Sequence, residues 1–229
     1  MGYLVCNLAI IRQALVPEFL LYCQRNPKAC PVLEITDTGS YEPKKLAPGA
    51  DLRTDLARYA IYRYGVREED QTDIVDLWED DFVAFLIGSG ISFDGALERA
   101  GVPTTKNRWA IRTGTQTVPA GRFHGPLVAI MRWLTPAQAI TAIQVTSRFP
   151  ACHGAPFHIG DPELIGADLQ RPLFGPAVPP IPKGLIPVFW ACGVTPQEAA
   201  LAAKIDLMIT QAPGHAFITD IEADRFAVT

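Results

Sequence analysis

Apolar residues fall into short runs along the chain, and most of these runs predict β-strands. The runs at residues 5–11 (VCNLAII) and 185–193 (LIPVFWACG) are almost continuous, which is typical of buried strands. Strand-like patterns also cover residues 32–39, 57–65, 126–134, 206–213 and 215–223.

Helical patterns stand between these strands, at residues 16–29, 76–85, 92–100, 135–149 and 195–205. The segment 135–149 fits a helix or a helix that runs into a strand. Two helices begin alike, with Thr135 three residues before Gln138 and Thr195 three residues before Glu198. Each threonine fits the N-cap of a capping box, with proline at the first helical position.

The alternation of strands and helices predicts an α/β protein. We expect a mixed sheet, because several strands are joined by short turns. Two Pro- and Gly-rich stretches, residues 41–56 and 151–184, predict long loops. A chain of 229 residues that is 48% hydrophobic can form one large domain or two closely packed smaller ones.

Charge and cysteine content narrow the class of protein. The formal net charge of −4, with lysine and arginine scattered singly, argues against nucleic acid as a partner. The first residues lack a basic region and reach Arg12 too soon to span a membrane, so we expect neither a signal peptide nor a membrane segment. The cysteines are odd in number and form no CxxC pair, which favours free thiols and a cytoplasmic protein. Their positions are Cys6, Cys23, Cys30, Cys152 and Cys192. The many apolar strand residues and the modest charge also favour a homo-oligomer.

The segment HGAPFHIGDP, residues 153–162, carries the densest group of chemically active side chains. Its prolines and glycines exclude a helix, so His153, His158 and Asp161 lie on a shaped loop. Loops that hold imidazoles and a carboxylate often carry binding or catalysis. The alternative is that both histidines satisfy turn carbonyls and that Asp161 starts a turn before Pro162.

A second candidate site is the junction between the strand at 185–193 and the helix that follows it. Ligands of α/β proteins bind beyond the carboxyl end of a strand, where the N-terminus of a helix favours an anion. Cys192, Gly193, Thr195 and Gln197 occupy this junction. Cys192 is either an activated nucleophile or a small buried wall residue, and we favour the wall.

Further candidates are isolated. His215 follows Pro213-Gly214 at a strand entrance and is either an acid/base group or a turn residue. Arg122, beside His124, could clamp a carboxylate or lie on the surface. The charges around Arg53 fit a solvated loop better than a site. No nucleotide-binding or serine-hydrolase motif is present, so we expect no cofactor.

A metal site would need several of these groups to meet. His153, His158, Asp161 and His215 could in principle supply three or four ligands, but none of their spacings matches a helix-based zinc pair. We therefore expect no metal.

Seven blocks of sequence resemble one protein family. They are LLYCQRNPKACPVLEITDTG, LAPGADLRTDLARYAIYR, DLWEDDFVAFLIG, PAGRFHGPLVAIMR, TSRFPACHGAPFHIGDP, IPVFWACGVTPQ and APGHAFITD. In this order they resemble the D-glutamate cyclase-like family, also known as the YcsI-like family of hydro-lyases, over nearly the whole chain. The chain departs from the family pattern at Val5, Thr117 and Ala216, and it lacks the stretch that usually precedes the first strand.

The resemblance implies a three-layer α/β/α part, residues 1–103 and 185–229, and a smaller two-layer α+β part, residues 104–184. It implies a carbon-oxygen lyase that removes water from a small amino or hydroxy acid, with D-glutamate and 5-oxo-D-proline as substrate and product and without ATP. The departures from the pattern leave an alternative, a non-catalytic binding protein for 5-oxoproline or a related acid. In either case we expect the histidine loop, the strand–helix junction and His215 to converge, with Arg122 and Thr195 holding carboxylates.

Overall fold

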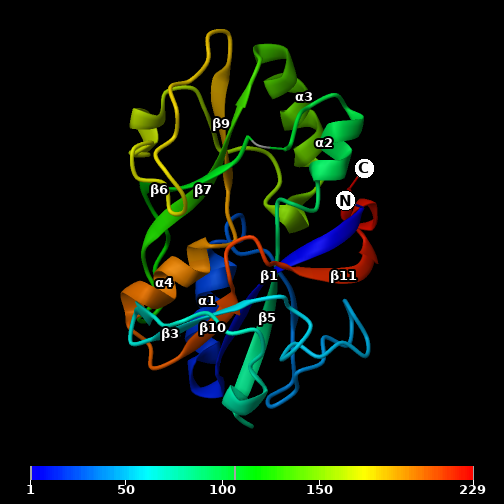
Figure 1. The fold of residues 1–229 in the computed structure, drawn as a ribbon, viewed down its shortest axis with the longest axis vertical. Helices are drawn as coiled ribbons and strands as arrows, with labels where there is room; N and C mark the ends of the chain where they lie inside the picture. Colours follow the sequence, from blue (N-terminus) through cyan, green and yellow to red (C-terminus); the bar gives the residue numbers. More distant parts are fainter. Residues whose placement is uncertain (1, 106, 229) are drawn as a thin grey trace.

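The computed structural model describes residues 2–105 and 107–228, which form two antiparallel sheets joined by one core (Figure 1). The larger sheet has the strand order β2-β5-β1-β10-β3-β4, and β11 also pairs with β1. Its strands are β1 (Tyr3–Arg12), β2 (Val32–Ile35), β3 (Tyr59–Arg63), β4 (Val66–Arg67), β5 (Phe82–Gly88), β10 (Met208–Gln211) and β11 (Phe217–Glu222).

The smaller sheet has the order β6-β7-β9-β8. Its strands are β6 (Trp109–Gln116), β7 (Pro126–Leu134), β8 (His158–Ile159) and β9 (Ile186–Ala191). Residues 185–193, which the family resemblance groups with the larger part, thus contribute β9 to the smaller sheet, paired with β7. The chain then returns to the larger sheet through a helix.

Within the described residues four α-helices pack on these sheets: α1 (Val16–Arg25), α2 (Asp94–Arg99), α3 (Pro136–Ser147) and α4 (Thr195–Ala203). Short 3-10 helices lie at Gln13–Leu15, Val75–Leu77, Pro150–Cys152, Pro162–Ile165 and Ala223–Phe226. Among the described residues no helix is long and apolar enough to cross a membrane.

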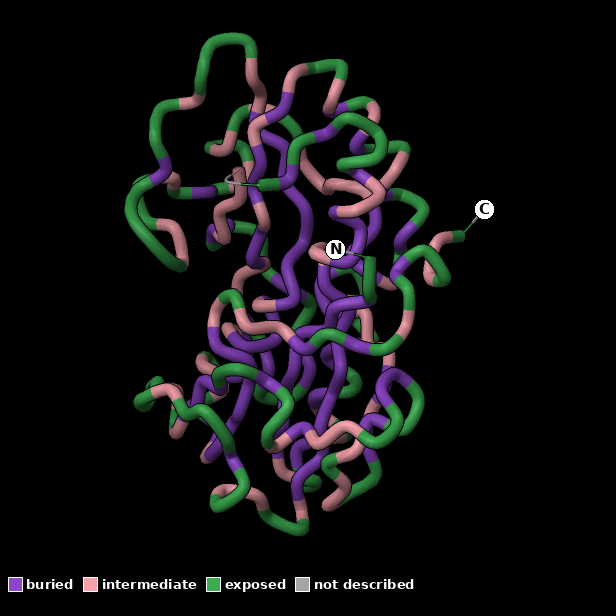
Figure 2. Tube along the Cα trace, turned by 45° about the vertical axis from the view of Figure 1, so that its right-hand side comes forward, coloured by how far each residue is buried: buried purple, intermediate pink, exposed green. Residues whose placement is uncertain are grey.

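Alternation along β1 explains the layers. Leu8 and Ile10 point to a core that also holds Leu134 and Trp190 of the smaller sheet, together with residues of α2 and α3. Ala9 and Ile11 point to the opposite face, which α1 and α4 cover. Figure 2 shows the buried strands passing through both halves of the molecule. Because one apolar core spans both sheets, the two halves of the molecule pack directly against each other.

The predicted α/β class is confirmed, with two corrections of detail. Every strand pair among the described residues is antiparallel, so the sheets are not mixed. The helix predicted at residues 76–85 is wrong: a 3-10 turn ends at Leu77, and β5 begins at Phe82. All seven residues of β5 are buried between β1 and β2, where an apolar run forms a central strand.

The two predicted capping boxes have different outcomes. Thr135 and Gln138 form the predicted capping box at the start of α3. At α4 the N-cap is Val194, and no side chain caps it. The Thr195 hydroxyl instead accepts a hydrogen bond from the Val128 N–H at 3.1 Å and donates one to the Cys192 carbonyl at 2.7 Å. Thr195 therefore ties the helix to β7.

Candidate active site

A cavity of about 250 Å³ lies between the two sheets. Residues from β1, β6, β7 and β9 line it, together with the loop after β5 and the connection from β10 to β11. Ligand pockets for drug-sized molecules are somewhat larger, so this cavity suits a small metabolite.

The cavity lies where the pairing of β1 is interrupted. One edge of β1 pairs with β11 up to Cys6 and with β10 from Ala9 onward. Between these pairings lie Asn7 and Leu8, and β10 ends at Gln211, so the chain leaves the sheet before β11 begins. The interruption gives a ligand access to side chains in the middle of a buried strand.

Two arginines form the charged wall of the site, and both pair with one aspartate behind it. Arg132, on β7, is 1% exposed and donates a hydrogen bond to Asp94 at 2.5 Å. Arg108 forms an ion pair with the other oxygen of the same carboxylate. Arg108 and Arg132 line the cavity. Two guanidinium groups thus share one carboxylate, and the nearby Glu98 carboxylate also favours the charged form of Arg132.

Several donor atoms of these arginines have no partner among the described residues. They are Nε of Arg108 and both Nε and Nη1 of Arg132. Burial lowers the pKa of Arg132, which the Asp94 carboxylate partly offsets. An arginine pKa starts so high that the group stays charged. A buried cation with free N–H groups needs a further anion, and a carboxylate fits the guanidinium fork.

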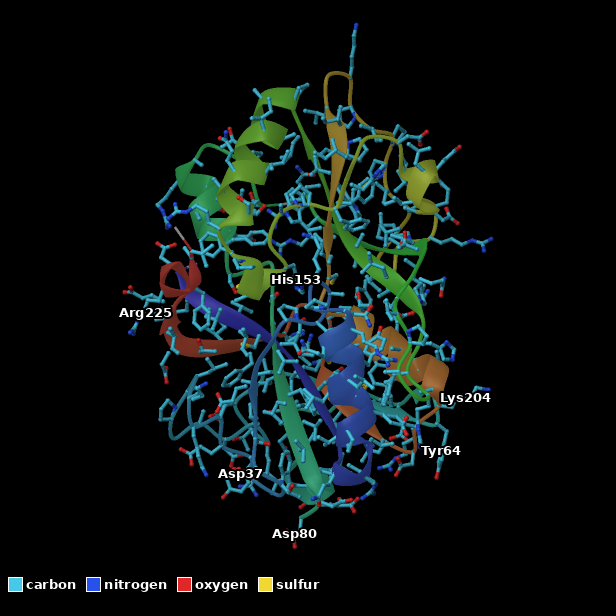
Figure 3. All side chains as sticks on the ribbon, turned by 180° about the vertical axis from the view of Figure 1, so that it is seen from behind. Asp37, Tyr64, Asp80, His153, Lys204 and Arg225 are labelled. Carbon is cyan, nitrogen blue, oxygen red and sulfur yellow. The ribbon has the colours of Figure 1, made fainter. Side chains whose placement is uncertain are left out.

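His153 lines the same cavity and is 2% exposed. Figure 3 shows it at the junction of the two halves of the molecule. Its Nδ1 lies 2.9 Å from the Lys28 carbonyl oxygen, which can only accept, so Nδ1 carries the hydrogen and Nε2 has the free lone pair. Burial lowers the pKa of His153 to about 4. The imidazole is therefore neutral at pH 7 and can accept a proton.

The position of His153 depends on a close contact between two backbone segments, the turn before it and β5. His153 itself adopts a left-handed backbone conformation, with φ of 77°, directly after the 3-10 turn that ends at Cys152. This turn lies against Gly88 of β5: a Cβ at Gly88 would lie 1.8 Å from the Ala151 carbonyl oxygen. Only glycine leaves room for the turn that carries the histidine.

The strand–helix junction contributes Cys192 and Gly193 to the cavity. Burial raises the pKa of the Cys192 thiol to about 11, so the thiol stays protonated at neutral pH. This favours the wall role over the nucleophile. All five cysteines are free and buried.

The other half of the histidine loop lies outside the cavity lining, so the predicted convergence does not extend to it. His158 sits on β8 opposite Phe189, whose side chain belongs to the core on the far face of the smaller sheet. Its Nε2 lies 2.8 Å from the Asp161 carbonyl oxygen. The Asp161 carboxylate accepts a hydrogen bond from the Glu163 N–H and caps a 3-10 turn. The register of β8 separates His158 from His153, and Asp161 lies in the turn that follows.

The remaining candidates are also outside the lining. His215 lies beside it, with Nδ1 2.9 Å from the Pro213 carbonyl oxygen, while Gly214 and Ala216 line the cavity. Arg122 is exposed and paired with Glu18. Thr195 and Gln197 are buried on α4. Among the described residues no three His, Cys, Asp or Glu side chains gather as a metal site.

Comparisons with known proteins agree with the sequence blocks. A family profile described as D-glutamate cyclase matches residues 83–220. The chain belongs to the D-glutamate cyclase family. Relatives from Geobacillus kaustophilus and Stutzerimonas stutzeri, both named "Putative hydro-lyase", are 51% identical over 99% of this chain and 88% of their own length. The relative named YcsI, from Bacillus subtilis, is 50% identical over 99% of this chain and 90% of its own.

A solved structure of a nitrogen repressor-like protein from Methanococcus jannaschii aligns with 90% of this chain and 81% of its own, at 14% identity and a TM-score of 0.45. That likeness carries no functional argument. For this member of the D-glutamate cyclase family, the function has to be argued from the cavity.

Proposed function

We propose that the protein is a hydro-lyase that closes D-glutamate to 5-oxo-D-proline with loss of water, without ATP, in the cavity between the two sheets. The observation that carries the proposal is the pair of arginines, which lines the cavity, shares the Asp94 carboxylate and leaves three buried nitrogen donors without a partner among the described residues. The family profile and the names of the relatives support the reaction class.

The proton balance of this reaction suits a neutral histidine. D-Glutamate carries an ammonium group and two carboxylates, and the product carries one carboxylate and a lactam N–H. Of the three ammonium hydrogens, one stays on nitrogen and two leave with a carboxyl oxygen as water. The reaction therefore needs protons to move from nitrogen to oxygen but takes up none from solvent.

The residues that line the cavity have separate roles in this reaction. Arg132 and Arg108 bind a carboxylate and fix the orientation of the substrate, which favours an intramolecular ring closure. His153 Nε2 accepts the two departing protons of the ammonium group one after the other and passes each to the departing oxygen. A bound anionic substrate favours the imidazolium and so raises the pKa of His153 from its low value in the empty site. Cys192 serves as a wall, because a thioester would not form from a carboxylate without an activating reagent.

The test is to incubate the purified protein with D-glutamate, without ATP, and to follow the product by chiral chromatography. L-Glutamate and a panel of hydroxy acids are run in parallel, and a protein-free sample measures spontaneous cyclisation. We expect 5-oxo-D-proline above that background. Absence of turnover with every substrate would contradict the proposal. Calorimetric binding of 5-oxo-D-proline in that case would favour the non-catalytic binding protein instead.

A further inference from the structure

A second polar wall of the cavity is made of two side-chain amides. Asn7 and Gln211 both line the cavity, and both are less than a tenth exposed. They lie at the interruption of β1 described above. The Leu8 N–H, which has no strand partner there, donates to Gln211 Oε1 at 2.7 Å. The Gln211 side chain thus replaces the missing strand.

This hydrogen bond determines the orientation of both amides. A backbone N–H can only donate, so the Gln211 atom that faces Leu8 is the oxygen, and its nitrogen points to Asn7. Gln211 Nε2 lies 2.7 Å from Asn7 Oδ1. The Asn7 oxygen is therefore occupied, and Asn7 Nδ2 is the free end of this series of hydrogen bonds. Its only hydrogen bond among the described residues is a long one, 3.4 Å, to the Gly88 carbonyl.

Gly193 holds the free end in place. A Cβ at Gly193 would come within 2.0 Å of Asn7 Nδ2, so the amide packs directly on the glycine. Any larger residue at position 193 would push the amide away. The donor is thus fixed by Gln211 on one side and by the strand–helix junction on the other.

We propose that Asn7 Nδ2 is an oxyanion donor for the carboxyl group that loses water, and that Gln211 is the positioning residue that keeps this donor turned toward the cavity. The inference rests on the proposed function, in which the attacked carboxyl passes through a tetrahedral state with negative charge on oxygen. The arginine wall binds the carboxylate that is retained, and the amide wall stabilises the one that reacts. Preorganised donors of this kind act mainly on the transition state.

The sharpest test is Gln211→Glu. Above the pKa of the introduced carboxyl, the ionised side chain can only accept, so Asn7 turns its nitrogen toward it and presents its oxygen to the cavity. Below that pKa, the protonated carboxyl donates to Asn7 Oδ1 and accepts from Leu8, as glutamine does. We therefore expect kcat with D-glutamate to fall about 100-fold at pH 8, with little change in KM, and to recover as the pH is lowered.

Three further variants complete the design. Gln144→Glu makes the same change on the exposed face of α3 and should keep the wild-type pH profile. Asn7→Leu removes the donor itself at similar volume and should lower kcat at every pH. Gly193→Ala displaces the amide and should lower kcat without the pH reversal. If kcat of Gln211→Glu is reduced equally at all pH values, or if only KM rises, the positioning role of Gln211 is overturned.

An NMR titration separates this inference from the proposed reaction. Glutarate has two carboxylates but no amine, so it can occupy the site without reacting. We expect it to shift the side-chain amide signals of Asn7 in wild-type protein, and not in Gln211→Glu at pH 8. Those shifts without turnover of D-glutamate would retain the amide donor and reject the reaction. Turnover without any shift of Asn7 would retain the reaction and reject the amide donor.

Discussion

Replacing Arg132 with methionine should strongly reduce activity while leaving the protein folded. Methionine fills a similar volume without charge, so the change removes one guanidinium from the cavity wall. Removing one partner of a buried, hydrogen-bonded charge pair costs about 2–5 kcal/mol of binding, which is roughly a 30- to 5,000-fold loss in kcat/KM.

The stability of the empty protein should respond differently. Arg132 leaves two buried donor nitrogens, Nε and Nη1, without partners, and each such group costs about 1–3 kcal/mol. Asp94 keeps its ion pair with Arg108 in the variant. These effects oppose the loss of the Arg132–Asp94 bond, so we expect the free energy of unfolding to change by less than about 2 kcal/mol. For a chain of this size that shifts Tm by less than about 8 °C.

The assay pairs steady-state kinetics with thermal unfolding followed by circular dichroism. Arg112→Met is the matched control, because Arg112 is an exposed arginine that pairs with Glu198 outside the cavity. It should retain activity within about threefold. Unfolding of the Arg132→Met protein would refute the reasoning, since Arg132 would then be structural. Full activity in that variant would refute it equally.

Three further predictions follow from the same geometry. His153→Gln should lower kcat about 100-fold. In the wild-type protein the pKa of His153 is lowered from 6.5 to about 4, so the unfolded state binds more protons than the folded state between these pH values. The free energy of unfolding should therefore fall by up to about 3 kcal/mol from pH 6.5 to pH 4. Chemical denaturation should show less of this fall in the variant. Cys192→Ala should keep activity within about tenfold of wild type. Alkylation of Cys192 in the native protein at pH 8 should be slow, because the pKa of its thiol is raised to about 11. An inactive Cys192→Ala variant would instead support Cys192 as a nucleophile. Gly88→Ala should lose about 1–3 kcal/mol of stability together with activity, because its Cβ displaces the turn that carries His153; Gly2→Ala, with open space around it, is the control.

Local patterns predicted most of the secondary structure. The apolar runs that became β1, β7, β9 and β10 contain consecutive buried residues, and β11 alternates between buried and exposed ones; both patterns identify a strand. The pairing could not be predicted, because it depends on which distant strands meet. The interruption of β1 that opens the cavity is a property of the pairing alone.

The candidate site was predicted only in part. His153, Cys192 and Gly193 line the cavity as expected from their place in a loop and at a strand end. His158 was indistinguishable from His153 in sequence, since strand register alone separates them. Arg132 and Asn7 were missed, although a signal existed.

That signal is a polar residue inside an apolar strand. Asn7 interrupts VCNLAII, Arg132 interrupts VAIMRWL, and Gln211 follows LMIT. Such a residue is costly to bury and therefore needs a partner. Asp94 and the amide pair are the partners here, but they come from segments that only the fold brings together.

The most direct test of the assigned site is a crystal structure of the protein with bound 5-oxo-D-proline. We expect the carboxylate of the product to accept a hydrogen bond from Nη1 of Arg132, with its ring between His153 and Asn7. Product bound elsewhere, with the cavity between the two sheets empty and Arg132 still unpartnered, would contradict the assignment of this cavity as the active site.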